Sequence, residues 1–185
     1  MTLIVEHPST AVPERRYALD VVLGDWMGLA WRAVPGDRAT TRITVEGDAD
    51  RELIVADDLL GRLDSGEDAS LLPPDPSRSA ATPPLGQMHP GIPAQVAAWY
   101  GRPLDGERWI DVQPHRIALG IDVLGSIFFM LSRLEERIVD KVDAHGRFAS
   151  GAATMVRAGR ERRAVADEWA DLLRAAIARL WPNAA

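Results

Sequence analysis

The feature of this sequence that most restricts its fold is a long apolar stripe, which directly follows a short apolar run. At a helical step the stripe occupies one face, and its residues are Leu124, Ile127, Phe128, Leu131, Leu134 and Ile138. Asp122 precedes the stripe at the position of an N-cap, where its carboxylate can accept hydrogen bonds from the first-turn amides. We predict one helix that begins after Asp122, runs through Ile138, and packs as a core element against a sheet or other helices.

The segment before residue 60 predicts one helix followed by three short strands. The helix spans residues 13–26, because Pro13 suits the first helical position and Gly28 can close the last turn. The pattern then changes to short apolar runs with turn-rich joints, which predicts strands at 29–34, 42–46 and 52–56. Strands spaced this closely favour antiparallel pairing.

Residues 64–93 form a proline-rich segment through which no regular helix or central strand can run. Seven of the thirteen prolines lie there, and each removes a backbone donor and restricts the residue before it. The segment is either a solvated linker or a strap over the surface. We favour the strap because it carries apolar residues that can anchor it, namely Leu71, Leu72, Leu85, Met88 and Ile92.

The remaining pattern completes a mixed α/β (α+β) fold class. Strands are predicted at 95–100, 108–112 and 116–121, weak structure from 149 to 159, and a final helix over 162–181 that Pro182 ends. We expect a mainly antiparallel or mixed sheet packed by about three helices, with the long proline-rich strap on its surface. A chain of 185 residues is long enough for a core of its own, and we treat residues 1–185 as a single domain.

Charge and composition narrow the class of protein. A formal net charge of -6 argues against a general affinity for nucleic acid or for an anionic membrane surface. The chain has no cysteine, which excludes disulfide and thiolate chemistry. The N-terminal residues lack the basic flank and apolar run of a secretory signal, and no window is long enough to cross a bilayer. We therefore expect a cytoplasmic protein that is not embedded in a membrane.

A polar cluster at the end of the predicted helix is the main candidate site. Glu135 projects into the apolar stripe, and a buried carboxylate needs a partner or loses its charge. The cluster comprises Asp122, Arg133, Glu135, Glu136, Asp143, His145 and Arg147. One interpretation is a charge-paired turn, with Phe148 as an apolar peg, that pins the helix to the body. The other is a small pocket for an anionic or hydroxyl-rich ligand.

Other motifs do not indicate a catalytic centre. The four histidines lack the spacing of metal ligands, and Ser126 lies inside a predicted helix instead of on a strand-to-helix elbow. No glycine pattern of a phosphate-binding loop follows a strand. Asp57 and Asp58 are adjacent carboxylates at a strand end, where a helix cap or a solvated turn is the usual role. We predict no catalytic residue, no metal and no cofactor.

Two motifs resemble the region that precedes the catalytic domain in a group of bacterial polysaccharide deacetylase-like (NodB-type) proteins. The first runs from Asp122 to Glu136 (DVLGSIFFMLSRLEE) and the second from Asp143 to Phe148 (DAHGRF). The likeness extends weakly over nearly the whole chain, through residues 14–17, 23–29 and 163–182. Ala164, where the family tends to have proline, and the long proline-rich strap depart from the family pattern.

The resemblance implies an accessory domain instead of a hydrolase. In those relatives the catalytic domain follows this region and supplies the metal-binding Asp and His residues, whose Asp-Asp and His-x-x-x-His pattern this chain lacks. We expect a non-catalytic domain that docks to a deacetylase catalytic domain or another partner, or to carbohydrate. Two alternatives remain: a ligand-binding protein or enzyme with a pocket around Glu135, His145 and Arg147, and a structural homo-oligomer, which would show a concentration-dependent mass.

Overall fold

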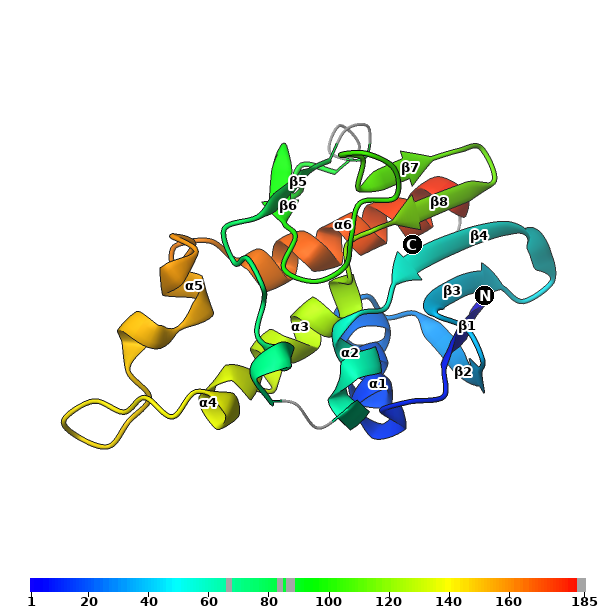
Figure 1. The fold of residues 1–185 in the computed structure, drawn as a ribbon. Coiled ribbons are helices and arrows are strands. Elements are labelled where there is room, and N and C mark those ends of the chain that lie inside the picture. Colours follow the sequence, from blue (N-terminus) through cyan, green and yellow to red (C-terminus); the bar gives the residue numbers. More distant parts are fainter. Residues whose placement is uncertain (66–67, 83–84, 86–88, 183–185) are drawn as a thin grey trace.

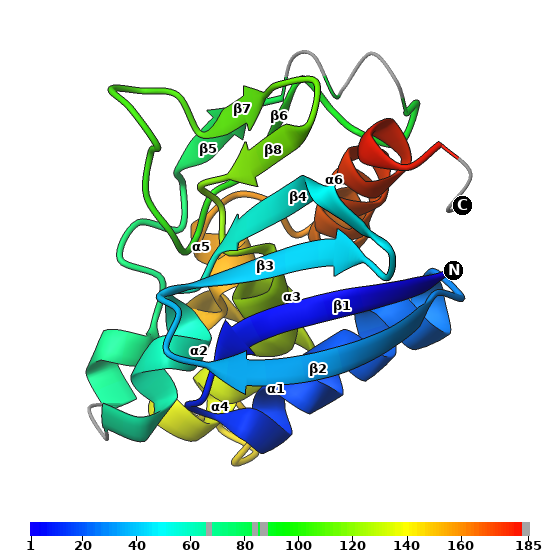
Figure 2. The same cartoon turned by 90° about the vertical axis from the view of Figure 1, so that its right-hand side faces the viewer.

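A six-stranded mixed sheet forms one layer of the protein (Figures 1 and 2). The computed structural model describes residues 1–65, 68–82, 85 and 89–182. The strand order is β2-β1-β3-β4-β8-β7, in which β1 with β2 and β4 with β8 run parallel and the other pairs antiparallel. The strands are β1 (Thr2–Pro8), β2 (Ala30–Gly36), β3 (Thr40–Val45), β4 (Asp48–Ala56), β7 (Ile110–Val112) and β8 (Arg116–Leu119).

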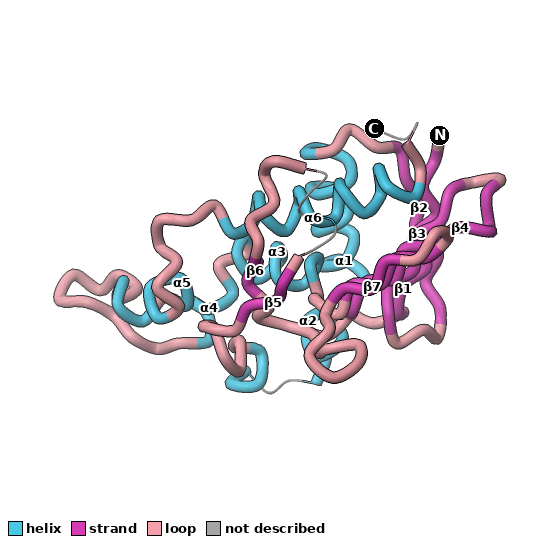
Figure 3. Tube along the Cα trace, turned by 90° about the horizontal axis from the view of Figure 1, so that it is seen from above, coloured by secondary structure: helices cyan, strands magenta, loops and turns pink. Residues whose placement is uncertain are grey.

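The main helices cover one face of this sheet, as Figures 2 and 3 show. They are α1 (Val12–Leu19), which continues as the π-helix η1 (Asp20–Trp26), α3 (Val123–Leu131) and α6 (Val165–Leu180). Helix α3 packs against both α1 and α6. Inward side chains such as Val5, Leu53 and Leu119 are buried beneath the helices, so the core lies between the two layers. The predicted mixed α/β (α+β) fold class is confirmed.

The opposite face of the sheet carries a row of alternating charges. Arg42 pairs with Glu6 across 3.3 Å and with Glu52 across 2.6 Å. Arg38 extends the row beyond Glu6, and Arg116 extends it beyond Glu52. These cross-strand pairs connect β1, β3, β4 and β8 on a face that the helices do not cover (Figure 2). The sheet therefore has one face packed against the core and one solvent-exposed face.

The proline-rich segment lies over the protein as a strap in its described part. Helix α2 (Leu59–Arg62) precedes it and η2 (Leu63–Ser65) begins it. Farther along are η3 (Asp68–Leu71) and β5 (Ser79–Ala81), which pairs with β6 (Gln95–Ala97). Leu71, Leu85 and Ile92 are buried anchors, as expected, whereas Met88 lies outside the described residues. The Tyr100 hydroxyl donates to the Leu71 carbonyl across 2.6 Å and attaches the strap to the body.

The predicted long helix is wrong as a single element. It is divided into α3 and α4 (Leu134–Ile138) at Arg133, whose φ of 52° is left-handed. Ser132 is the C-cap of α3, and its hydroxyl donates to the Phe128 carbonyl across 2.7 Å beside the helical bond from its amide, across 2.9 Å. Glu135 therefore lies in a separate short helix and is only half-buried, outside the apolar stripe of α3.

Residues 132–163, which we call the arm, extend from the body at the end away from the sheet (Figures 1 and 3). The arm contains α4, the exposed turn at residues 143–148, η5 (Ser150–Ala152) and α5 (Thr154–Arg157). It leads back to α6, which follows after residue 164. The weak structure expected for residues 149–159 takes the form of these two short helices.

The expected antiparallel pairing of the first three predicted strands is only partly correct. β3 and β4 are antiparallel, but β2 does not pair with β3 in the described sheet. β2 instead lies parallel to β1, a strand absent from our predictions, with α1 and η1 between them in the chain. Parallel neighbours need such a crossover, and the helix that precedes β2 provides it.

Candidate functional site

An enclosed polar centre lies where β4 and β8 end. These neighbouring strands run parallel, so their carboxyl ends meet at one edge of the sheet. Asp57 and Asp58 follow β4 directly, and Asp122 follows β8. In open α/β sheets this edge is where ligands generally bind. This edge is therefore a candidate site for chemistry.

Asp57 forms a buried ion pair with Arg15 from α1. The exposed fractions of the two side chains are 4% and 2%, and the contact is bidentate, with Nη1 donating to one carboxylate oxygen and Nη2 to the other across 2.9 Å. The guanidinium also donates to Thr10, with Nε 2.6 Å from its carbonyl oxygen and Nη2 3.1 Å from its hydroxyl. The expected solvated turn is wrong for Asp57, because Arg15 reaches it from another element.

Asp122 joins three segments of the chain through its carboxylate. Oδ1 accepts from the amide of Gly125 across 2.8 Å, which confirms the predicted N-cap of α3. Oδ2 accepts from the amides of Asp58 and Leu59 across 2.8 and 2.9 Å and so fixes the start of α2 as well. Gly125 is required here, because a Cβ on it would lie 2.3 Å from Oδ2 of Asp122.

The electrostatics of this centre oppose ionisation of Asp122. The pKa of its carboxyl is raised from an ordinary 3.8 to about 7, mainly by complete burial and also by the charge of Asp57. The three amide donors act in the opposite direction because they stabilise the carboxylate. A perturbed carboxyl in such a place is a general marker of functional sites. Here its oxygens are already occupied by the backbone.

A pocket of about 310 Å³ opens beside Asp57 and Asp58. Asp58 is half-exposed in it, accepts from the amide of Gly101 across 2.8 Å, and pairs with Arg62 across 3.2 Å. Arg102 lines the same pocket with an exposed side chain. The expectation that Asp58 caps a helix is wrong, since its side chain makes no capping hydrogen bond to α2 and contacts Gly101 instead.

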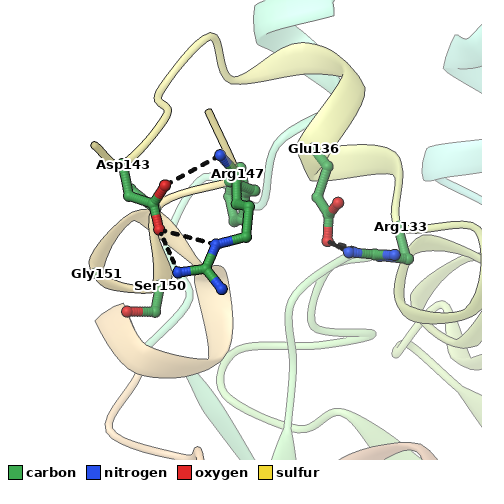
Figure 4. A pocket seen from close by; sticks show the side chains of 8 residues that line it. Arg133, Glu136, Asp143, Arg147, Ser150 and Gly151 are labelled. Carbon is green, nitrogen blue, oxygen red and sulfur yellow. Dashed lines mark hydrogen bonds and ion pairs between the residues drawn. The ribbon is translucent and has the colours of Figure 1, made fainter. Parts of the chain in front are cut away.

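A larger pocket of about 650 Å³ lies on the arm (Figure 4). Four members of the predicted cluster line it: Arg133, Glu136, Asp143 and Arg147. Arg133 pairs with Glu136 across 2.6 Å, and Arg147 pairs with Asp143 across 3.0 Å. Figure 4 shows the two pairs on either side of the pocket. Oδ1 of Asp143 also accepts from the amides of His145 and Arg147, and these bonds lower the pKa of its carboxyl.

The other three members of the predicted cluster lie elsewhere. Asp122 belongs to the enclosed centre at the far end of α3. Glu135 accepts from the amide of Thr154 across 2.7 Å and so connects α4 to α5. The His145 side chain is exposed, and only its backbone amide contributes to the turn. Both ion pairs of the pocket are local, so the expected charge clamp between helix and turn is replaced by the Glu135–Thr154 hydrogen bond.

Residues 2–182 match the model of a protein family that is described as a family of unknown function (DUF7033). The chain belongs to this family. The matched span includes both the enclosed centre and the arm of this DUF7033 member. No match to the chain was found among curated proteins or among solved structures. Within the described residues of the DUF7033 chain, no helix combines the length and apolar character needed to cross a bilayer.

Sequence reasoning missed the central role of Arg15 and Asp57 in this DUF7033 member. The two residues are 42 positions apart, and the motif that Asp57 forms with Asp58 resembles many solvent-exposed strand ends. One signal was available: Arg15 falls on the same side of the predicted helix as Ala18 and Val22, both of which are buried. A charged residue on a buried face needs a carboxylate partner, and Asp57 directly follows β4, whose Leu53 and Val55 are buried.

Proposed function

We propose that this chain is a non-catalytic accessory domain, related to the region that precedes the catalytic domain of polysaccharide deacetylase-like proteins. It would act by docking to a catalytic domain or another partner in carbohydrate metabolism. The observation that carries the proposal is the position of the second motif of the resemblance. The motif at residues 143–148 forms the exposed turn of the arm, where residues 144–147 are all exposed (Figure 1).

An exposed motif requires an explanation other than core packing. The first motif includes α3, whose buried side chains account for its residue types through packing alone. The turn at residues 143–148 has no such role, because the arm extends away from the core. Exposed residues that distinguish a group of proteins more often serve recognition than stability. A docking element on the arm is consistent with this arrangement.

The enclosed centre supports a scaffold role for the body. Both oxygens of Asp57 are engaged by Arg15, and both oxygens of Asp122 accept from backbone amides. A carboxylate that performs general acid–base catalysis must instead reach a substrate proton at hydrogen-bond distance. These side chains hold α1, α2 and α3 against the carboxyl ends of β4 and β8. The body would then present the arm on a rigid base.

Binding to a deacetylase catalytic domain tests the proposal. The catalytic domain would be one encoded in the same gene neighbourhood, and the measurement is isothermal titration calorimetry with the purified chain. We expect a saturable heat of binding and a complex that remains together in size-exclusion chromatography. If neither method detects a complex with any such domain, the docking function is wrong.

A second candidate is a ligand-binding protein whose site is the arm pocket. The observation in its favour is that four predicted cluster residues line one pocket of about 650 Å³. Arg147 is 73% exposed, so Arg147→Ala should abolish binding of a small anionic or hydroxyl-rich ligand and leave the melting temperature nearly unchanged. A large loss of stability in this variant would instead assign Arg147 to holding the turn.

A further inference from the structure

The arm is more basic than the rest of the chain. Residues 132–163 carry eight Lys and Arg against five Asp and Glu, whereas the whole chain carries 21 against 27. At the base of the arm Arg160 is buried, and its guanidinium contacts neutral oxygens of Ser77, Arg78 and Ser79. Among the described residues it forms no ion pair within 4 Å, so its charge adds to the positive potential of the arm. A basic region on an acidic protein attracts acidic partners.

The two arginines of the arm pocket retain donors for a ligand. Nε and Nη2 of Arg147 both contact one oxygen of Asp143, across 3.2 and 3.0 Å. Nε and Nη2 of Arg133 both lie 2.6 Å from one oxygen of Glu136. Each Nη1 has no hydrogen-bond partner among the described residues. The side chains are 72% and 73% exposed, so an incoming carboxylate can reach both guanidinium groups.

Local contacts place these arginines beside the pocket before any partner binds. Arg133 is one of two non-glycine residues with positive φ in the described chain, a backbone conformation that residues with a side chain rarely adopt. Such outliers concentrate at functional sites, where the strain orients a side chain. The Asp143 carboxylate fixes the other arginine by accepting from the amide of Arg147 across 3.0 Å. The ion pairs with Glu136 and Asp143 hold the two guanidinium groups beside the pocket.

We infer that the arm pocket binds an acidic segment of a partner protein, with Arg133 and Arg147 pairing with its Asp or Glu side chains. The inference rests on the proposed docking function and names the surface and the chemistry of the docked segment. Apolar neighbours favour a protein partner over a small anion. Phe148 lines the pocket, and on the same arm Val142 is 63% and Val156 42% exposed. Arginine and aromatic side chains with apolar neighbours are typical of protein interfaces.

The test measures fluorescence anisotropy of a labelled peptide, Glu-Glu-Leu-Glu-Glu-Leu, titrated with the full chain at low salt. We expect the double variant Arg133→Ala/Arg147→Ala to bind at least tenfold more weakly than the wild type. Arg16→Ala is the matched control, because Arg16 is 74% exposed, forms an i,i+4 ion pair and does not line the pocket. It should change affinity less than twofold. Circular dichroism melting of all variants checks that they remain folded.

The outcomes separate this inference from the docking function. If the peptide does not bind the wild type, or binds the wild type and the double variant equally well, the inference is wrong. Tighter binding of a hexagalacturonate probe that depends on the same two arginines would also overturn it, since the partner would then be an acidic polysaccharide. A deacetylase domain that binds the wild type and the double variant equally would leave docking intact and exclude this surface. A bound peptide without any bound deacetylase domain would exclude the docking function alone.

Discussion

Replacing Arg15 should lower the free energy of unfolding more than replacing any exposed arginine. In Arg15→Met the Asp57 carboxylate, whose side chain is 4% exposed, keeps the Thr41 hydroxyl at 3.3 Å as its one donor among the residues that the structure describes. Leaving one charge of a buried pair without its partner costs about 3–5 kcal/mol. Methionine replaces most of the apolar stem, so lost packing adds little. For a chain of this size we expect a fall in melting temperature of roughly 6–20 °C.

The double variant Arg15→Met/Asp57→Leu distinguishes an unpaired charge from simple loss of contacts. It removes both charges together, so we expect it to recover about 2 kcal/mol or more of the loss. A residual deficit of about 1–2 kcal/mol should remain, because Thr10 loses the two hydrogen bonds that Arg15 donates to it. This comparison isolates the buried Asp57 charge as the main cost.

Urea denaturation of four proteins provides the measurement: the wild type, the single variant, the double variant and Arg16→Ala. Arg16 is the next residue along and is 74% exposed, so its ion pair with Asp20 should contribute less than about 0.5 kcal/mol. The reasoning is refuted if Arg15→Met costs no more than Arg16→Ala. It is equally refuted if the double variant is no more stable than Arg15→Met.

Three further predictions concern the same centre. Folding raises the pKa of Asp122 from an ordinary 3.8 to about 7, so the folded state binds this proton more tightly, and the contribution of Asp122 to stability is greatest at low pH and falls by up to about 1.4 kcal/mol per pH unit as pH rises from 4 to 7. Urea denaturation of the wild type and Asp122→Asn at pH 5 and pH 8 measures this contribution. A stability difference that becomes more favourable to the wild type at pH 8 contradicts the prediction. Gly101→Ala should cost more than about 3 kcal/mol, because φ is +97° and a Cβ would lie 2.0 Å from a backbone oxygen. The control Gly106→Ala, at positive φ but in open space, should cost about 1–2 kcal/mol. Equal falls in melting temperature for the two variants would contradict the prediction. Gly125→Ala should destabilise despite the better helix propensity of alanine, because the new methyl displaces the Asp122 carboxylate, and a raised melting temperature would show that the carboxylate can move.

Local patterns predicted most of the elements correctly. The apolar stripe after Asp122 predicted a core helix and its cap, and α3 begins there with the expected amide contact. The final helix, five of the strands from residue 42 onward (β3, β4, β6, β7 and β8) and the buried anchors of the strap follow from periodicity and proline placement in the same way, whereas β5 in the strap was not predicted. These features depend on interactions among residues that are close in sequence, and the sequence pattern is enough to predict such interactions.

The features that failed depend on contacts between distant segments. The helix break lies at Arg133, where the chain leaves the body and enters the arm. Glu135 accepts a hydrogen bond from Thr154, which belongs to another short helix. The arm pocket was predicted in part, since four of its charged residues lie within fifteen positions of one another. Its separation from Asp122 was not predicted, because nothing in the residue order indicates that the helix ends so early.

The sequence by itself determined the fold class, the position of the core helix with its cap, and a charged turn beyond it. Only the tertiary structure decided that β1 and β2 and that β4 and β8 run parallel, which brings Asp57, Asp58 and Asp122 to one edge of the sheet. It also decided that Arg15 neutralises Asp57 from 42 residues away. The physical reason is that helix and cap energies come from neighbours along the chain, whereas a buried charge selects its partner only after the layers have packed around it.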